Sequence, residues 1–326
     1  MDEHPKITAL VPSYNHGRFI RQRVESILQQ TYPNIELIVI DDCSSDESDE
    51  VIRSLQAQHG FKYVRNPRNS GTPFSAWESV LAHATGDYIW VCESDDYAEP
   101  TFLETAVAAL STNHDAVLFY CNSWVVDASG QRVGHTKSYF SDYWKDARWE
   151  AAFSAVGSQE LATFQLRGQT VPNMSSAVIS TRVFRSAYTP FLKKLSLTGD
   201  WLFVGLVMKQ GNVLFSPLAL NNFRKHQSTA RALVTSAREQ AEFILTIYLL
   251  FRVARRPIRE FARFMAPPAS RLLSGPAKIG DVLKVLLSIS WTDACRCMLL
   301  LAASMPMNLV YFRMFLARIS GDKMRS

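Results

Sequence analysis

The first ninety residues alternate between short apolar runs and segments with the apolar spacing of helices. The apolar runs, each as long as a buried strand, cover residues 7–11, 35–40, 61–64 and 88–92. Apolar residues recur at helical spacing in the intervals 18–30, 51–55 and 74–81. This β-α-β-α-β-α-β order predicts an α/β fold, in which a parallel sheet carries helices on both faces.

The pattern is less regular beyond residue 115. Residues 124–169 are rich in loop-forming residues, and no element is assigned there. The expected elements are strands at 116–120, 213–217 and 220–224 and helices at 182–191 and 201–210. After residue 230, helical segments mix Leu, Ile, Phe and Arg and are interrupted by prolines. We therefore expect one domain over residues 1–235 and a helical C-terminal region over 236–326.

Acidic residues follow two of the predicted strands. Asp41 and Asp42 come after the second strand, and Glu93, Asp95 and Asp96 come after the fourth. The carboxyl ends of parallel strands form the edge where α/β sheets bind ligands. Oxygen-only ligands suit a hard divalent cation that carries a phosphate-bearing substrate. The alternative is that these residues are turns or helix N-caps, but two such clusters after two strands favour a shared site.

Composition places the chain among globular proteins. Of its 326 residues 47% are hydrophobic and 20% charged, which is enough apolar surface for a packed core. The five cysteines are odd in number and scattered, as expected in a reducing compartment. Cys295 and Cys297 have no second pair or His cluster beside them, so zinc is not expected. The start MDEHPKITAL lacks the pattern of a signal peptide, and none is expected.

Positive charge is concentrated in the C-terminal region. The net charge is +5, but residues 238–326 hold 14 Lys and Arg against 6 Asp and Glu. Basic residues mixed with apolar helices favour an anionic membrane surface over nucleic acid. An interfacial helix is expected where Arg252, Arg255, Arg256, Arg259 and Arg263 flank Leu249, Leu250, Phe251, Phe261 and Phe264. The 16 uncharged residues between Arg296 and Arg313 are fewer than the roughly 20 that a spanning helix needs.

Two long segments carry a family resemblance. VPSYNHGRFIRQRVESILQQTYPNIELIVIDDCSSDES and NPRNSGTPFSAWESVLAHATGDYIWVCESDDYAEP resemble the nucleotide-sugar half of family-2 inverting glycosyltransferases with a GT-A fold. Later, TGDW at 198–201 and NNFRKHQST at 221–229 resemble elements of bacterial members. The resemblance implies a GT-A, Rossmann-like, mostly parallel mixed sheet. Residues 1–110 would bind the nucleotide sugar, and residues 111–235 would form the acceptor half.

The resemblance also implies roles for single residues. Asp42 would accept a hydrogen bond from the base, and Gly71 would let the backbone approach the nucleotide. Asp95 and Asp96 would bind Mg²⁺ or Mn²⁺, the family's Asp-x-Asp element, with Asp95 also counted among the nucleotide-binding residues. Glu93 stands where the family has Asp, and its longer side chain would reach a water or the donor sugar instead of the metal. The residues that would line the base and ribose are Pro12, Ser13 and Tyr14.

Two later residues complete the predicted site. Asp200 matches the position of the family's general base, which would take the proton of the acceptor hydroxyl. Its alternative role is to cap the helix that begins at Trp201. His226 would ligate the metal or contact the diphosphate, with a solvated loop histidine as the alternative.

The resemblance implies that the protein transfers one sugar, with inversion, from a nucleoside-diphosphate sugar to a hydroxyl group. The favoured nucleotide is UDP or dTDP, and the acceptor would be a lipid-linked or surface glycan. The processive signature Gln-x-x-Arg-Trp is absent, which favours a single addition. The protein would act at the cytoplasmic face of the inner membrane as a peripheral enzyme. The rivals are a sugar-nucleotide nucleotidylyltransferase and a catalytically silent carbohydrate- or lipid-binding module on the same fold.

Overall fold

The computed structural model describes residues 4–226, 234–257, 260–261, 264 and 279–304. The chain divides into two compact units, Met1–Ala232 and Leu233–Ser326. The sequence placed the division at residue 235. Each unit is described by itself below.

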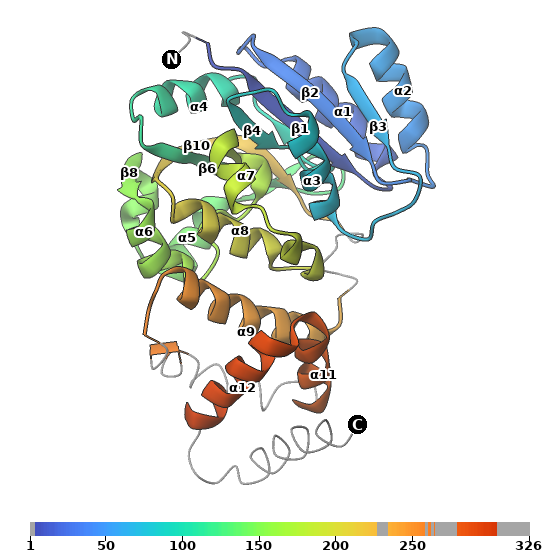
Figure 1. Cartoon of the computed structure of the whole chain (residues 1–326). Coiled ribbons are helices and arrows are strands. Elements are labelled where there is room, and N and C mark those ends of the chain that lie inside the picture. Colours follow the sequence, from blue (N-terminus) through green and yellow to red (C-terminus); the bar gives the residue numbers. More distant parts are fainter. Residues whose placement is uncertain (1–3, 227–233, 258–259, 262–263, 265–278, 305–326) are drawn as a thin grey trace. The chain divides into compact units, whose positions relative to one another are not determined.

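The first unit is built on a mixed sheet whose parallel part is the predicted one (Figure 1). Four strands pair in parallel in the order β3-β2-β1-β4. Their bounds are β1 (Ile7–Ser13), β2 (Ile35–Asp41), β3 (Lys62–Arg65) and β4 (Tyr88–Val91). The crossover helices are α1 (Gly17–Leu28), α2 (Ser48–His59) and α3 (Pro73–His83). The α/β fold expected from the sequence is thus confirmed for this part.

Most residues of β1, β2 and β4 are buried, which explains why their sequences are largely apolar runs, whereas the edge strand β3 is only partly buried. Ile7, Ala9 and Val11 of β1 belong to a core cluster with residues of α1, α2 and α4 (Phe102–Ser111). The opposite face packs against α3, α7 (Thr181–Ala187) and α8 (Gly199–Met208), whose rings meet at centroid distances of 4.7 to 5.7 Å. The rings are those of Phe74, Trp77, Phe184 and Phe203.

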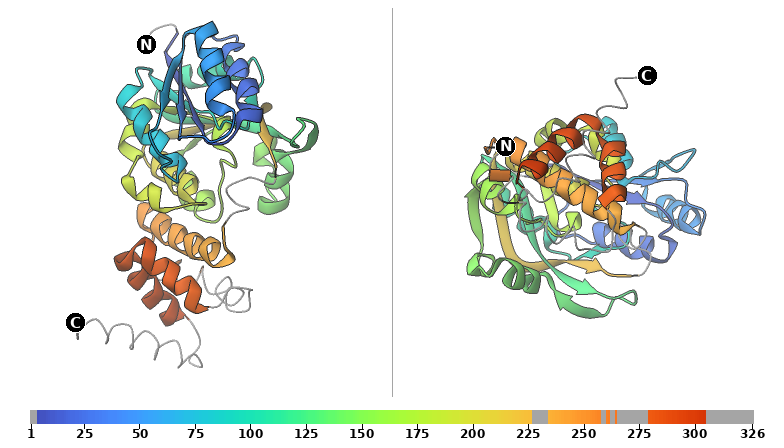
Figure 2. Two further views of the ribbon diagram at one scale, coloured as in Figure 1. Left: turned by 90° about the vertical axis from the view of Figure 1, so that its right-hand side faces the viewer. Right: turned by 90° about the horizontal axis from the view of Figure 1, so that it is seen from below.

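The rest of the sheet is mixed. β9 (Ala177–Ser180) lies antiparallel between β4 and β6 (Ala116–Val126), and β10 (Asn212–Arg224) runs parallel to β6. The two long strands lie side by side in Figure 2. Three short strands complete the described sheet: β5 (Tyr97–Ala98), β7 (Arg132–His135) and β8 (Phe153–Val156).

One prediction about these strands is wrong. The expected strands 213–217 and 220–224 are a single strand, β10, whose register against β6 shifts between Ser216 and Ala219. Pro217 falls in this irregular part. Proline cannot donate a ladder hydrogen bond, so a strand accommodates it at a bulge instead of ending there.

The region 124–169 contains short elements that the sequence did not identify. After β7 come α5 (Thr136–Trp144), η1 (Ala147–Glu150), β8, α6 (Gly157–Glu160) and η2 (Leu161–Gln165). Stacked and edge-to-face rings hold them together, with Trp149 buried between Phe140 and Phe164. The helix expected at 182–191 ends at Ala187, and a 3₁₀ turn, η4 (Pro190–Lys194), follows. Proline at 190 disfavours helical backbone at the residue before it. A second 3₁₀ turn is η3 (Met174–Ser176).

The described elements of the second unit are α9 (Ser236–Val253), α11 (Ile279–Ile289) and α12 (Trp291–Ser304). An ion pair of 2.9 Å between Arg252 and Asp293 joins α9 to α12. Among the described residues, no helix is both long enough and apolar enough to cross a membrane. The uncharged stretch that ends at Arg313 lies partly outside the described residues.

The structure describes part of the expected interfacial helix. Helix α9 ends at Val253, and Arg255 takes a left-handed backbone with φ of 52°. Leu250, Phe251 and Phe261 are buried, and Leu249 and Phe264 are half-buried. Arg252, Arg255 and Arg256 are exposed, and association with a membrane remains a prediction. Arg259 and Arg263 lie outside the described residues.

Candidate active site

The loops after β1 and β2 form one side of the site. Asn15, at a φ of 54°, accepts a hydrogen bond from the backbone N–H of Ser45 and donates its own backbone N–H to Ser44 Oγ. These bonds tie the two loops together. Pro12 and Ser13 are buried at the end of β1, whereas Tyr14 is 44% exposed. The exposed ring is accessible for stacking, but its predicted role remains a prediction.

The two aspartates after β2 differ in environment. Asp41 is fully buried and bonded to the backbone N–H and hydroxyl of Ser44 and to Arg65. Asp42 accepts hydrogen bonds from Asn66 Nδ2 at 2.7 Å and from the Ser70 backbone N–H at 2.9 Å. Asp41 is therefore a structural residue, and Asp42 holds the loop of residues 66–70.

That loop borders an open hollow of about 540 Å³, lined by residues 66–70. Gly71 follows it with φ of 75°, in the left-handed region that favours glycine. A Cβ built at Gly71 would meet no heavy atom within 4 Å. The need for glycine here is thus conformational, and the surrounding space is open.

The loop after β4 is held by distant segments. The carboxylate of Asp96 is buried and accepts hydrogen bonds from Asn173 Nδ2 and from the backbone N–H of Arg224, each at 2.8 Å. The Arg224 side chain donates to the carbonyl of Asp95 at 2.7 Å. Ser175 Oγ accepts the backbone N–H of Glu93 at 3.0 Å. The loop is therefore fixed from β10 and from the turn before β9.

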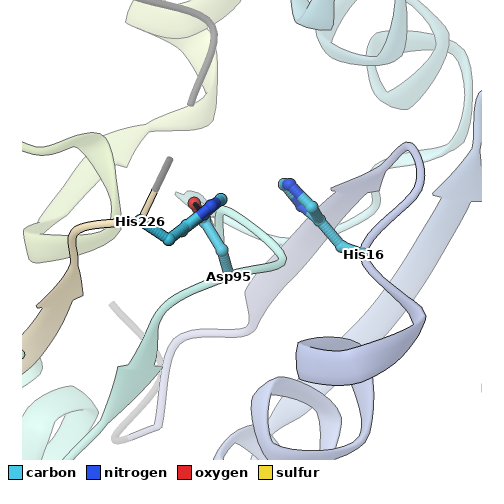
Figure 3. Close-up of side chains that lie close together, drawn as sticks. All are labelled: His16, Asp95 and His226. Atoms are coloured by element: carbon cyan, nitrogen blue, oxygen red, sulfur yellow. Dashed lines mark hydrogen bonds and ion pairs between the residues drawn. The ribbon is translucent and has the colours of Figure 1, made fainter. Parts of the chain in front are cut away.

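Three side chains converge beside this loop. Figure 3 shows His16 from the loop after β1, Asp95 from the loop after β4 and His226 from just beyond β10, pointing toward one another. One ligand atom from each lies within 4.8 Å of the others. His226 Nε2 is 2.9 Å from Asp95 Oδ2. Imidazole nitrogens and a carboxylate oxygen are suitable ligands for a divalent ion, so the residues fit a metal site.

The predicted metal ligands are only partly brought together. Asp95 and His226 share the cluster, but Asp96 is outside it, because its carboxylate is engaged by Asn173 and Arg224. The expected set was two carboxylates and one imidazole, whereas the cluster contains one carboxylate and two imidazoles. His16 was not predicted as a ligand. The one feature of the sequence that could have indicated His16 is its position in the loop after β1, directly after Asn15. The strand β1 neighbours β4, so the loops after these two strands lie at the same edge of the sheet.

Electrostatics distinguish the ionisable groups of the cluster. Burial lowers the pKa of His16, an effect to which His226 adds and which Asp95 opposes. His16 is therefore neutral at pH 7, the form that binds metals. Burial would raise the pKa of Asp95, but the His226 hydrogen bond and the nearby imidazoles lower it below its usual value. Asp95 is therefore ionised.

The neighbouring carboxylates hold their protons more tightly. Burial and the charges of Asp95, Asp96 and Asp200 raise the pKa of Glu93 to about 8, which Arg23 partly offsets. Burial and the charge of Asp95 raise the pKa of Asp96 to about 7. The charge of Asp200 contributes to the raised pKa of Glu93, so these two carboxylates lie close enough to interact although they are far apart in the sequence.

Asp200 lies in the first turn of α8, whose N-cap residue is Thr198, so Asp200 is not the N-cap. Its carboxylate accepts hydrogen bonds from Gln169 Nε2 at 2.7 Å and from the Trp201 backbone N–H at 2.8 Å. A Cβ on Gly199 would lie 2.4 Å from the Phe74 ring, so glycine allows α8 to begin in close contact with α3. Whether Asp200 acts as a base remains a prediction.

A parallel sheet with crossover helices, an acidic loop after its fourth strand and a His-Asp-His cluster beside that loop together define a GT-A type of α/β protein. Comparison with known sequences identifies the family. The sequence profile described as glycosyl transferase family 2 matches residues 8–166. Over these residues, which are just under half of the chain, the protein is similar to glycosyl transferase family 2.

Relatives agree with this assignment. The glycosyltransferase GlyG of Streptococcus pneumoniae is 37% identical over 99 residues, which are 30% of this chain and 33% of GlyG. The poly(ribitol-phosphate) β-N-acetylglucosaminyltransferase TarS of Staphylococcus aureus is 30% identical over 115 residues, 35% of this chain and 20% of TarS. The matched region thus spans a third or less of these relatives.

Solved structures share the fold. A fragment of S. aureus TarS in complex with UDP-GlcNAc superposes with a TM-score of 0.66 and 18% identity, covering 90% of this chain and 83% of the fragment. The Pyrobaculum calidifontis mannosyltransferase PcManGT, in complex with GDP-Man and Mn²⁺, gives a TM-score of 0.54 and 16% identity, covering 99% of this chain and 81% of PcManGT. The GT-A fold predicted from the sequence is confirmed.

The raised pKa of Glu93 predicts a pH-dependent effect on stability. In the folded protein this pKa is about 8, against an ordinary value of 4.5, so the stability that Glu93 contributes is full below pH 4.5 and is lost as the pH rises through about 8. Gln is neutral throughout. Glu93→Gln should therefore stabilise the metal-free protein at pH 8, by on the order of 1–2 kcal/mol given its partial exposure, and not at pH 4.5.

Calorimetry in EDTA at the two pH values measures this effect. Glu50→Gln, at an exposed position on α2, is the matched control and should show no such difference between pH values. Equal shifts in the melting temperature of Glu93→Gln at both pH values would contradict the assigned pKa.

Proposed function

We propose that the chain is an inverting glycosyltransferase that moves one sugar from a nucleoside-diphosphate sugar to a hydroxyl acceptor. The proposal rests on the His16–Asp95–His226 cluster at the carboxyl edge of the sheet. The Glu93 carboxylate lies in the same loop as Asp95, and the charge of Asp200 helps to raise its pKa. A diphosphate needs a countercharge, and an attacking hydroxyl needs a base. Both kinds of group occur at this edge.

The donor would lie across the loops after β1, β2 and β4. Pro12, Ser13 and Tyr14 would border the base and ribose, and Asp42 would hold the loop of residues 66–70 around it. UDP is the favoured nucleotide because the TarS fragment is known in complex with UDP and UDP-GlcNAc. The ion held by Asp95 and His226, Mg²⁺ or Mn²⁺ in the family, would offset the charge of the diphosphate leaving group. Glu93 would lie near the donor sugar.

Asp200 would act as the general base. In a direct displacement, the acceptor oxygen forms a bond to the anomeric carbon while the bond to the diphosphate oxygen breaks, which inverts the configuration. The acceptor hydroxyl loses its proton in this step, and a carboxylate can take it. Gln169 and the first turn of α8 hold the Asp200 carboxylate in a fixed orientation.

The first test of this function is donor turnover. UDP-, dTDP- and GDP-sugars are incubated with the full-length protein and Mn²⁺, and the release of nucleoside diphosphate is measured. At least one donor should be hydrolysed slowly without an acceptor, and EDTA should suppress the release. A protein that binds these nucleotides but releases no diphosphate from any donor would be a silent binding module instead.

The second test is Asp200→Asn. Asn preserves size and can still accept the Trp201 backbone N–H but cannot take a proton, so transfer should fall by about 10²–10⁴-fold while donor affinity is unchanged. Turnover with acceptor and calorimetric donor binding are measured on the same variant. Asp115→Asn, exposed before β6, is the control and should keep full turnover. Near-normal transfer by Asp200→Asn would assign the base to another carboxylate.

The acceptor and the place of action form the remaining part of the proposal. The acceptor would be a lipid-linked or surface glycan, by analogy with TarS, whose name gives poly(ribitol phosphate) as its acceptor. The enzyme would work at the cytoplasmic face of the inner membrane. Attraction of the basic second unit to anionic lipid would hold it there, since Arg252, Arg255 and Arg256 are exposed.

Liposome flotation tests the membrane part. The full-length protein should float with vesicles that contain anionic lipid and should be released by high salt, because the attraction is electrostatic. Replacing Arg255 and Arg256 by Gln should weaken the binding. Equal flotation with neutral and anionic vesicles, or none with either, would contradict it.

A further inference from the structure

We propose that His16 is a third protein ligand of the metal, so that the site prefers a transition-metal ion such as Mn²⁺ or Co²⁺ to Mg²⁺. The inference extends the proposed function, because the ion would serve the same donor site. It starts from the one cluster of three metal-ligating side chains found among the described residues, His16, Asp95 and His226.

The ring and the backbone of His16 are each held by a serine hydroxyl. Its Nδ1 lies 2.7 Å from Ser94 Oγ, and Ser94 precedes Asp95. Its backbone N–H donates to Ser48 Oγ at 3.1 Å. When Nδ1 carries the proton and donates it to Ser94, the other ring nitrogen presents its lone pair. Metal-ligating histidines are oriented by such a bond from the nitrogen that does not bind the metal.

The supply of oxygen ligands is limited. Asp96, the second carboxylate expected at the metal, is 1% exposed and already accepts bonds from Asn173 and Arg224. The cluster therefore contains two imidazoles and one carboxylate. Imidazole favours transition-metal ions, and Mg²⁺ favours oxygen ligands and water. A set of three also leaves coordination positions for phosphate oxygens of the donor.

His226 and Asp95 are already in direct contact, at 2.9 Å, without His16. A site of those two residues alone would offer one imidazole nitrogen, and so a weaker preference for transition-metal ions. The imidazole of His16, whose ring centroid lies 5.7 Å from that of His226, adds the second nitrogen. His16 thus strengthens the selectivity of the site.

Metal binding to the full-length, nucleotide-free protein tests the assignment. Affinities for Mn²⁺, Co²⁺ and Mg²⁺ are measured by Mn²⁺ electron paramagnetic resonance, with the other two ions as competitors. Wild type should bind Co²⁺ more tightly than Mn²⁺, and Mn²⁺ at least about tenfold more tightly than Mg²⁺. His16→Asp exchanges nitrogen for oxygen and should reduce the Mn²⁺ to Mg²⁺ ratio about tenfold or more. His114→Gln, exposed before β6, is the matched control.

A measurement on the wild type alone guards against a variant that fails to fold. Electron spin-echo modulation of bound Mn²⁺ counts coupled imidazole nitrogens, and two coupled rings are expected. One ring or none, or a His16→Asp protein that folds and keeps the wild-type ion ratio, would overturn the assignment. Donor hydrolysis is read separately, so an enzyme that turns over donor without the predicted selectivity would refute this inference and leave the proposed function standing.

Discussion

The site depends on the hydrogen bonds of one buried guanidinium group, that of Arg224. It donates to the carbonyls of Asp95, Asp127 and Ala128 and to Gln22 Oε1, and it lies 4.8 Å from the Phe19 ring. Its backbone N–H binds the Asp96 carboxylate. A buried cation is stable only when its donors are satisfied, and here the partners come from α1, the loop after β4 and the end of β6. One side chain therefore joins three segments.

The position of His226 follows from this constraint. Arg224 ends β10 and is fixed against the loop after β4, so a residue two positions further along the chain must emerge beside Asp95. The contact between His226 and Asp95 at 2.9 Å is the result. The same loop is fixed from the other direction by Asn173 and Ser175. Protein contacts thus hold the acidic loop from two directions.

The parts of the fold that could be predicted are those set by local periodicity. Three of the four parallel strands, β1, β2 and β4, are largely buried and have apolar sequences, and the helices between the strands have one apolar side. The elements between residues 124 and 169 could not be predicted, because rings far apart in sequence hold short pieces together. The contact of Asp96 with Asn173 spans 77 residues, and that with Arg224 spans 128. Separations of this kind leave no periodic signal.

In each acidic cluster, two adjacent aspartates differ in their surroundings. Asp41 is the last residue of β2 and Asp42 follows it, and successive strand side chains point to opposite faces. Asp95 and Asp96 lie in the loop between β4 and β5, where the hydrogen bonds to Asn173 and Arg224 engage Asp96. Asp41 and Asp96 are buried and bonded within the protein. Asp42 and Asp95 remain partly exposed on the side of the loops. In each adjacent pair, one carboxylate is thus a structural anchor and the other lies at the candidate site. The group of described residues that could hold a metal therefore has a single carboxylate, Asp95, because Asp96 is engaged within the protein, and its other members are the imidazoles of His16 and His226.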